Sequence, residues 1–190
     1  KGDIDDVAIW SRALSSNEVA IIYNAGTPVS HIPPYGFNDW ASANGLDGSA
    51  GRESGMSDNP DGDGLDNLAE FALAGHPLDP NDGAKFFVLS NPNGGEPATE
   101  KICFTIAVLA GAPIFSGSPS LSSSTNGFTY TSEGSLDLID FTAPIVAVDP
   151  VSNDLAPLPA NYEYRSFSMD DTGGSPDRGF LRVKVTQDTP

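Results

Sequence analysis

The C-terminal half of the chain alternates hydrophobic and polar residues in short runs. Turns rich in Gly, Pro, Ser, Asn and Asp separate these runs, as is typical of antiparallel strands. The stretch from Ser116 to Gly127 is rich in serine and predicts a surface loop. Residues 85–190 are therefore expected to form an antiparallel β-sandwich. The expected strands are Phe86–Leu89, Ile102–Val108, Phe128–Thr131, Ile145–Val148, Tyr162–Met169 and Phe180–Val185.

Residues 37–84 show helical spacing instead. A short helix is expected over Phe37–Leu46, with Asn38 or Asp39 as its cap. A second helix should follow an acidic loop, because Leu65, Leu68, Phe71 and Ala72 recur at helical spacing. With Phe37 and Trp40 facing Leu68 and Phe71, the two helices predict a small hydrophobic unit.

Residues 1–28 predict one strand, Ile4–Trp10, and one short helix. Ser15 and Glu18 have the spacing of a capping box. The proline-containing residues 29–36 form a linker to the helical unit. The predicted fold is thus mainly β: a C-terminal sandwich preceded by a two-helix loop unit and an N-terminal strand-helix segment.

A family resemblance lies in this N-terminal segment. Gly2-x-Ile-Asp-Asp-Val-x-Ile-Trp-x-Arg-Ala-Leu-Ser, followed by Glu18 and Tyr23-Asn-Ala-Gly, resembles the end of a LamG-type, concanavalin A-like jelly roll. The resemblance implies an incomplete sandwich, and a lone strand must pair with something to satisfy its backbone groups. Two interpretations stay open. Either the segment is a truncated domain, or Ile4–Trp10 adds to a sheet edge in this molecule or in an identical subunit.

The acidic loop carries the most specific motif. Asn59-Pro-Asp-Gly-Asp-Gly-Leu-Asp-Asn-Leu-Ala-Glu70 matches the twelve-residue EF-hand-type loop, in which alternate positions converge on one calcium ion. Gly64 fills the sixth position, where the chain must turn sharply. The expected ligands are the side chains of Asn59, Asp61, Asp63, Asn67 and Glu70 and the backbone carbonyl of Leu65, with Asn67 acting directly or through water.

Asn59 departs from the motif, because the first position is usually Asp. Three carboxylates remain, so the affinity for calcium should be lower than in a four-carboxylate loop, within the range of extracellular modules. Magnesium is less favoured because it demands small octahedral geometry. The loop also resembles those of dockerins and thrombospondin type 3 repeats. A single copy favours a structural clip over a regulatory switch, and the alternative without an ion is a simple Asp-Gly turn.

The composition of the chain limits which classes of binding partner are expected. The chain has 9 Lys and Arg against 26 Asp and Glu, a formal charge of −17, which disfavours nucleic acid and anionic membranes and favours cations. No stretch approaches a membrane span. Cys103 is the sole cysteine and is expected to be buried. An exported domain without an internal disulfide can obtain rigidity from a bound metal instead, which adds weight to the acidic loop.

Catalysis is not expected. His31 lies in the linker and His76 in a turn, and no nucleophile motif is present. Tyr162 and Tyr164, with Phe167, offer a possible sugar-stacking platform, although packing within the sandwich is the favoured interpretation.

The order of the three segments resembles the C-terminal region of large secreted proteins of the Verrucomicrobia and Planctomycetes type. This resemblance implies an extracellular or cell-surface setting. The first hypothesis is a calcium-stiffened structural or adhesive module, assembling into filaments by donating Ile4–Trp10. The alternative is a carbohydrate-binding module of a larger glycan-degrading protein.

Overall fold

The computed structural model describes residues 36–90, 102–149, 155–170 and 178–188. The chain divides into two compact units, Lys1–Pro34 and Tyr35–Pro190, and all described residues belong to the second. The expected strand Ile4–Trp10, the following helix and His31 therefore lie outside the described residues.

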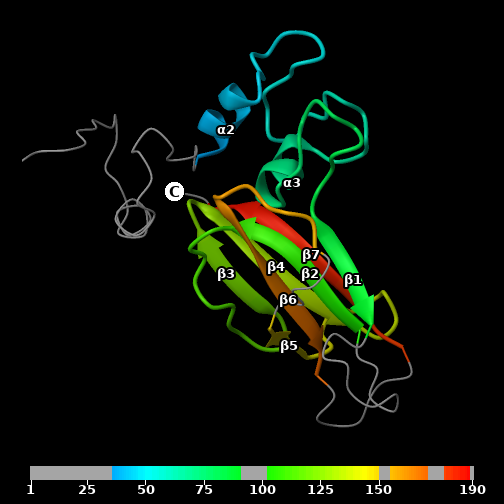
Figure 1. The fold of residues 1–190 in the computed structure, drawn as a ribbon. Coiled ribbons are helices and arrows are strands. Elements are labelled where there is room, and N and C mark those ends of the chain that lie inside the picture. The colour runs from blue at the N-terminus through cyan, green and yellow to red at the C-terminus, as the bar shows by residue number, and fades with distance from the viewer. Residues whose placement is uncertain (1–35, 91–101, 150–154, 171–177, 189–190) are drawn as a thin grey trace, which may run out of the picture. The chain divides into compact units, whose positions relative to one another are not determined.

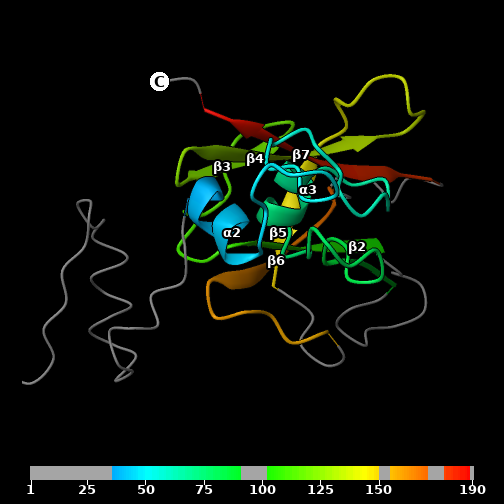
Figure 2. The same cartoon turned by 90° about the horizontal axis from the view of Figure 1, so that it is seen from above.

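Two antiparallel sheets form the body of this second unit, as the sequence predicts (Figure 1). One sheet has the order β1-β2-β6-β5 and the other β3-β4-β7. Seen from the helix end in Figure 2, the sheets are separate layers. The strands are β1 Phe86–Ser90, β2 Ile102–Leu109, β3 Leu121–Thr125, β4 Phe128–Ser135, β5 Ile145–Val148, β6 Tyr162–Met169 and β7 Phe180–Gln187.

The core between the sheets follows from the two-residue period of a strand. Phe104, Ile106 and Val108 of β2 are buried in one cluster with Phe167 of β6 and Tyr130 of β4. Cys103 is also fully buried, as expected, and is a free thiol. The alternating pattern thus places large side chains between the layers.

The expected surface loop Ser116–Gly127 is wrong in part, because it contains β3. Leu121 and Ser123 face inward and are buried, while Ser122 and Ser124 hydrogen-bond to the hydroxyls of β4. Asn126 and Gly127 both have positive φ, 53° and 82°, as a two-residue type I′ hairpin requires. The Asn-Gly turn and the cross-strand hydroxyl pairs stabilise a strand that its serines alone do not favour.

The helices are α2, Phe37–Ala43, and α3, Asn67–Ala72, and they lie at one end of the sandwich (Figure 1). The predicted aromatic cluster is confirmed: Phe71 packs edge-on against Phe37 and Trp40, and Leu68 packs against the same cluster. Phe71 also contacts Phe128 of β4, with ring centroids 5.1 Å apart. The helices therefore share a core with the sheets.

The predicted cap and helix limit need correction. The N-cap of α2 is Gly36, without a side-chain cap hydrogen bond, rather than Asn38 or Asp39. Leu65 precedes α3, whose N-cap is Asp66; the Asp66 carboxylate accepts a hydrogen bond from the Ala69 amide at 2.8 Å. This cap ends the acidic loop and starts the helix that carries Glu70.

Candidate metal centre

The loop between α2 and α3 is wound by hydrogen bonds from its own backbone. The Gly62 amide donates to Asn59 Oδ1, the Asp63 amide to Asp61 Oδ1 and the Leu65 amide to Asp63 Oδ1, at 2.8, 3.2 and 2.7 Å. Gly62 and Gly64 have φ values of 76° and 99°, which side chains other than glycine rarely adopt. The Asp-Gly repeat thus produces the tight winding that brings alternate side chains to one side.

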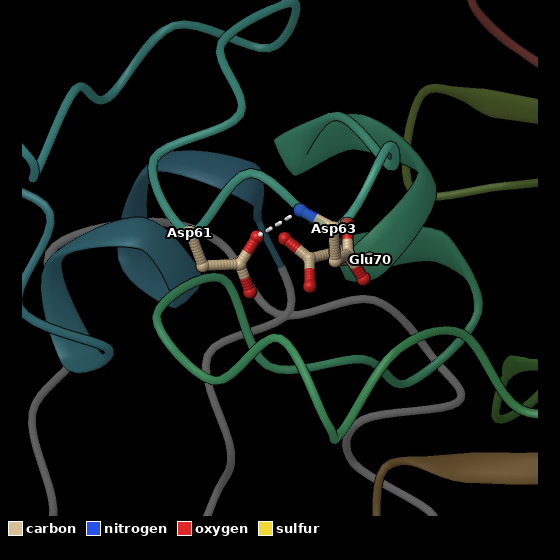
Figure 3. Close-up of side chains that lie close together, drawn as sticks. All are labelled: Asp61, Asp63 and Glu70. Atoms are coloured by element: carbon tan, nitrogen blue, oxygen red, sulfur yellow. Dashed lines mark hydrogen bonds between the residues drawn. The ribbon is translucent and has the colours of Figure 1, made fainter.

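Three of the predicted ligands converge. Asp61, Asp63 and Glu70 each offer one carboxylate oxygen, and these three oxygens lie within 4.8 Å of one another. Figure 3 shows the side chains pointing toward a common point, two from the loop and one from α3. Spacings of this size suit oxygen atoms around a cation with metal–oxygen distances of about 2.3–2.6 Å.

The hydrogen bonding of these carboxylates is incomplete. Glu70 is fully buried, and neither of its carboxylate oxygens has a hydrogen-bond partner among the residues that the structure describes. Asp61 Oδ2 is also buried, and no group in the described part of the chain hydrogen-bonds to it. Buried anionic oxygens are stable only when they are paired or bind a metal, so the three orphaned oxygens fit a cation.

Electrostatics lead to the same conclusion. Burial, together with the negative charges of Asp61 and Asp63, raises the pKa of Glu70 from 4.5 to about 8 in the ion-free protein. Asp66 and Asp82 add smaller repulsions. The described neighbourhood therefore favours either a proton or a positive ion on Glu70.

The other predicted ligands have these surroundings. Asn59 is exposed, and its Oδ1 accepts the Gly62 amide. Asn67 is fully buried, and its Nδ2 donates to the carbonyls of Glu53 and Gly55 at 3.0 and 2.8 Å. These two bonds fix the amide, whose Oδ1 finds no hydrogen-bond partner in the described segments. The roles of Asn59, Asn67 and the Leu65 carbonyl as ligands stay predictions.

Sequence reasoning missed the contacts that hold α3 against the sandwich. The Tyr162 hydroxyl donates to the Phe71 carbonyl at 2.6 Å, and the Tyr130 hydroxyl donates to the Ala72 carbonyl at 2.9 Å. The amide of Lys85 donates to the carbonyl of Leu73 at 2.7 Å. These donors satisfy carbonyls that a helix end leaves without partners. No local sequence motif predicts these hydrogen bonds, because their donors lie far away in the sequence.

A close backbone approach also went unpredicted. A Cβ atom on Gly83 would lie 3.1 Å from Asp63 Oδ2 and 3.2 Å from Leu65 Cδ1. The segment after α3 therefore packs directly on the loop. The Asn-Asp-Gly sequence at 81–83 is a turn signal, although it does not indicate what the turn contacts.

The histidine considered for catalysis and the tyrosines considered for sugar stacking hydrogen-bond or pack within the fold. His76 Nδ1 accepts a hydrogen bond from the Leu78 amide. Tyr162 is 8% exposed. Tyr164 donates its hydroxyl to the Ala156 carbonyl, and Phe87 packs edge-on against its ring. Tyr162 and Tyr164 therefore have packing roles, which was the favoured interpretation.

Comparison with protein-family models, curated proteins and solved structures finds no match. None of the helices that the structure describes is long and apolar enough to cross a membrane.

Proposed function

We propose that this protein is a non-catalytic, calcium-binding structural module in which one ion joins the acidic loop to helix α3. The observation that carries the proposal is Glu70, a fully buried carboxylate that faces Asp61 and Asp63 and whose two oxygens have no hydrogen-bond partner within the described ranges. The three carboxylates would hold the ion, and a hard cation with oxygen ligands would neutralise them.

Calcium is the favoured ion. All three converging groups are carboxylates, and no histidine or cysteine joins the cluster among the described residues. Calcium accepts irregular sets of six to eight oxygens, whereas magnesium needs near-ideal octahedral geometry. A loop that supplies mixed carboxylate, amide and backbone oxygens fits calcium better.

An extracellular or cell-surface setting follows from the same chemistry. Extracellular modules bind calcium with dissociation constants of about 10⁻⁴–10⁻³ M, which suits a loop with three carboxylates. The chain has no second cysteine for an internal disulfide. A bound ion would cross-link the loop to α3 and give the module rigidity, as a disulfide does in other exported domains.

Calorimetric titration of the full chain, stripped of metal by a chelator, tests the proposal. We expect one calcium site in the wild type and no measurable binding by Glu70→Gln. Glu53→Gln is the matched control, because its carboxylate lies outside the triad and its Oε1 accepts a hydrogen bond from the Gly51 amide. A wild type that binds no calcium at millimolar concentration would overturn the proposal.

Self-assembly by strand donation extends this function. The edge strand β1 leaves Phe86 and Val88 52% and 66% exposed, so this edge offers apolar surface to an added strand. Ile4–Trp10 of an identical subunit has the alternating pattern such a strand needs, and an open head-to-tail contact propagates into a filament. Deleting Lys1–Ser11 should then leave monomers in light scattering. Oligomers that persist unchanged after the deletion would refute strand donation.

A further inference from the structure

Helix α3 is too short to hold Glu70 in place by itself. It spans six residues, Asn67–Ala72, and helices shorter than about 12 residues are marginal in water without tertiary support. The position of the Glu70 carboxylate therefore depends on what fixes the two ends of this helix. At its start, Asp66 caps the Ala69 amide.

The end of α3 is fixed by two buried hydroxyls from different sheets. Tyr162 belongs to β6 of the four-stranded sheet, and its hydroxyl donates to the carbonyl of Phe71, the residue after Glu70. Tyr130 belongs to β4 of the other sheet, and its hydroxyl donates to the carbonyl of Ala72. The Tyr130 hydroxyl also accepts the amide of Leu109, at the end of β2. The two sheets and α3 thus meet at adjacent carbonyls.

These hydrogen bonds are made where water does not compete. Tyr130 is fully buried, and Tyr162 is 8% exposed. Burial raises the pKa of both phenols, so both remain protonated and able to donate. Removing either hydroxyl would leave a buried carbonyl without its hydrogen-bond partner. Losing one partner of a buried hydrogen bond costs more free energy than losing both partners.

We infer that Tyr130 and Tyr162 are positioning residues for the metal site, fixing the turn of α3 that carries Glu70 against both sheets. This inference rests on the proposed function. A bound ion would be held by Glu70 together with Asp61 and Asp63, and the two hydroxyls would keep the backbone next to Glu70 in the position that the structure shows. Loss of a hydroxyl frees the helix end, and calcium must then order it on binding.

The test is calcium titration of three full-length variants, Tyr130→Phe, Tyr162→Phe and Tyr164→Phe. Each loses one hydroxyl that donates to a backbone carbonyl, but the acceptor of Tyr164 is the Ala156 carbonyl and not a carbonyl of α3. We expect the dissociation constant for calcium to rise about three- to tenfold for Tyr130→Phe and Tyr162→Phe, the size of the one hydrogen bond to α3 that each variant loses. The control should stay within twofold of the wild type.

Melting temperatures in chelator and in calcium separate positioning from a merely structural role. A structural role would lower both melting temperatures equally and leave calcium affinity unchanged, and that result would overturn the inference. An equal loss of affinity in Tyr164→Phe would also overturn it. If Tyr130→Phe or Tyr162→Phe fails to fold, the calcium affinity of the other variant tests the positioning role. A wild type that does not bind calcium refutes the proposed function itself, whereas normal binding by both variants refutes only the positioning role.

Discussion

Replacing Glu70 by Gln should have opposite effects with and without calcium. In the ion-free protein Glu70 is buried, its oxygens have no hydrogen-bond partner, and Asp61 and Asp63 repel its charge. Gln keeps the shape, removes that repulsion and replaces one carboxylate oxygen by an amide that can donate a hydrogen bond. Glu70→Gln should therefore be at least as stable as the wild type in chelator at about pH 8, where repulsion is substantial.

In calcium the order should reverse, because the wild type gains the free energy of binding to its folded state. With a dissociation constant of about 10⁻⁴–10⁻³ M and about 10 mM free calcium, this gain is about 1.4–2.7 kcal/mol. For a folded unit of this size the melting temperature should rise by roughly 3–11 °C. Glu70→Gln loses a ligand with two oxygens and should show little or no rise.

Differential scanning calorimetry of both proteins, in chelator and across a calcium titration, measures this crossing. Glu53→Gln should follow the wild type under both conditions, since its carboxylate is outside the triad. The reasoning would be refuted if Glu70→Gln melted lower than the wild type by the same amount with and without calcium. Glu70 would then support the fold without binding an ion.

Two further predictions concern strand β4. A Cβ atom on Gly134 would lie 2.7 Å from Ile145 Cγ2 and 2.8 Å from the Ala143 carbonyl oxygen, so Gly134→Ala should lower the free energy of unfolding by about 1–3 kcal/mol in urea titrations. Ser132→Ala is its control: the buried Ser132 hydroxyl has no hydrogen-bond partner among the described residues, so its removal should be neutral or stabilising. Equal losses of stability in the two variants would contradict the packing argument. Burial opposes ionisation of Glu133, but hydrogen bonds from Lys184 and Arg182 outweigh it and lower the pKa below 4.5. A carboxylate whose pKa is lower in the folded than in the unfolded protein stabilises the fold at pH values above the unfolded pKa. This stability is lost as the pH falls through the folded pKa. Below about pH 4.5 the wild type should therefore lose stability more steeply than Glu133→Gln. Parallel acid unfolding curves would contradict this.

The parts of the fold that were predictable are those in which one residue type repeats at a fixed spacing. The run Tyr162–Met169 is a strand with the expected limits, because alternation over eight residues leaves little choice of structure. The carboxylates of Asp61, Asp63 and Glu70 converge because the loop spacing itself sets which side chains share a side. Local pattern and final structure agree at these positions.

Other features depend on contacts far apart in sequence. The serines of β3 form a strand because their hydroxyls meet Thr131 and Thr129 across the hairpin. The hydroxyls of Tyr130 and Tyr162 reach carbonyls 58 and 91 residues away. Sequence periodicity identifies a tyrosine as buried, but it does not identify which acceptor the hydroxyl finds, since that depends on how the layers are assembled.

The site combines repulsion among three carboxylates with hydrogen bonds that join α3 to both sheets. Three carboxylates crowd together at the start of α3, and this crowding opposes folding until a positive charge arrives. The same helix ends on hydrogen bonds from both sheets. A cation that relieved this repulsion would therefore order α3, the helix that contacts both sheets. Stability of the whole sandwich, and not of the loop alone, should then follow the calcium concentration of the surroundings.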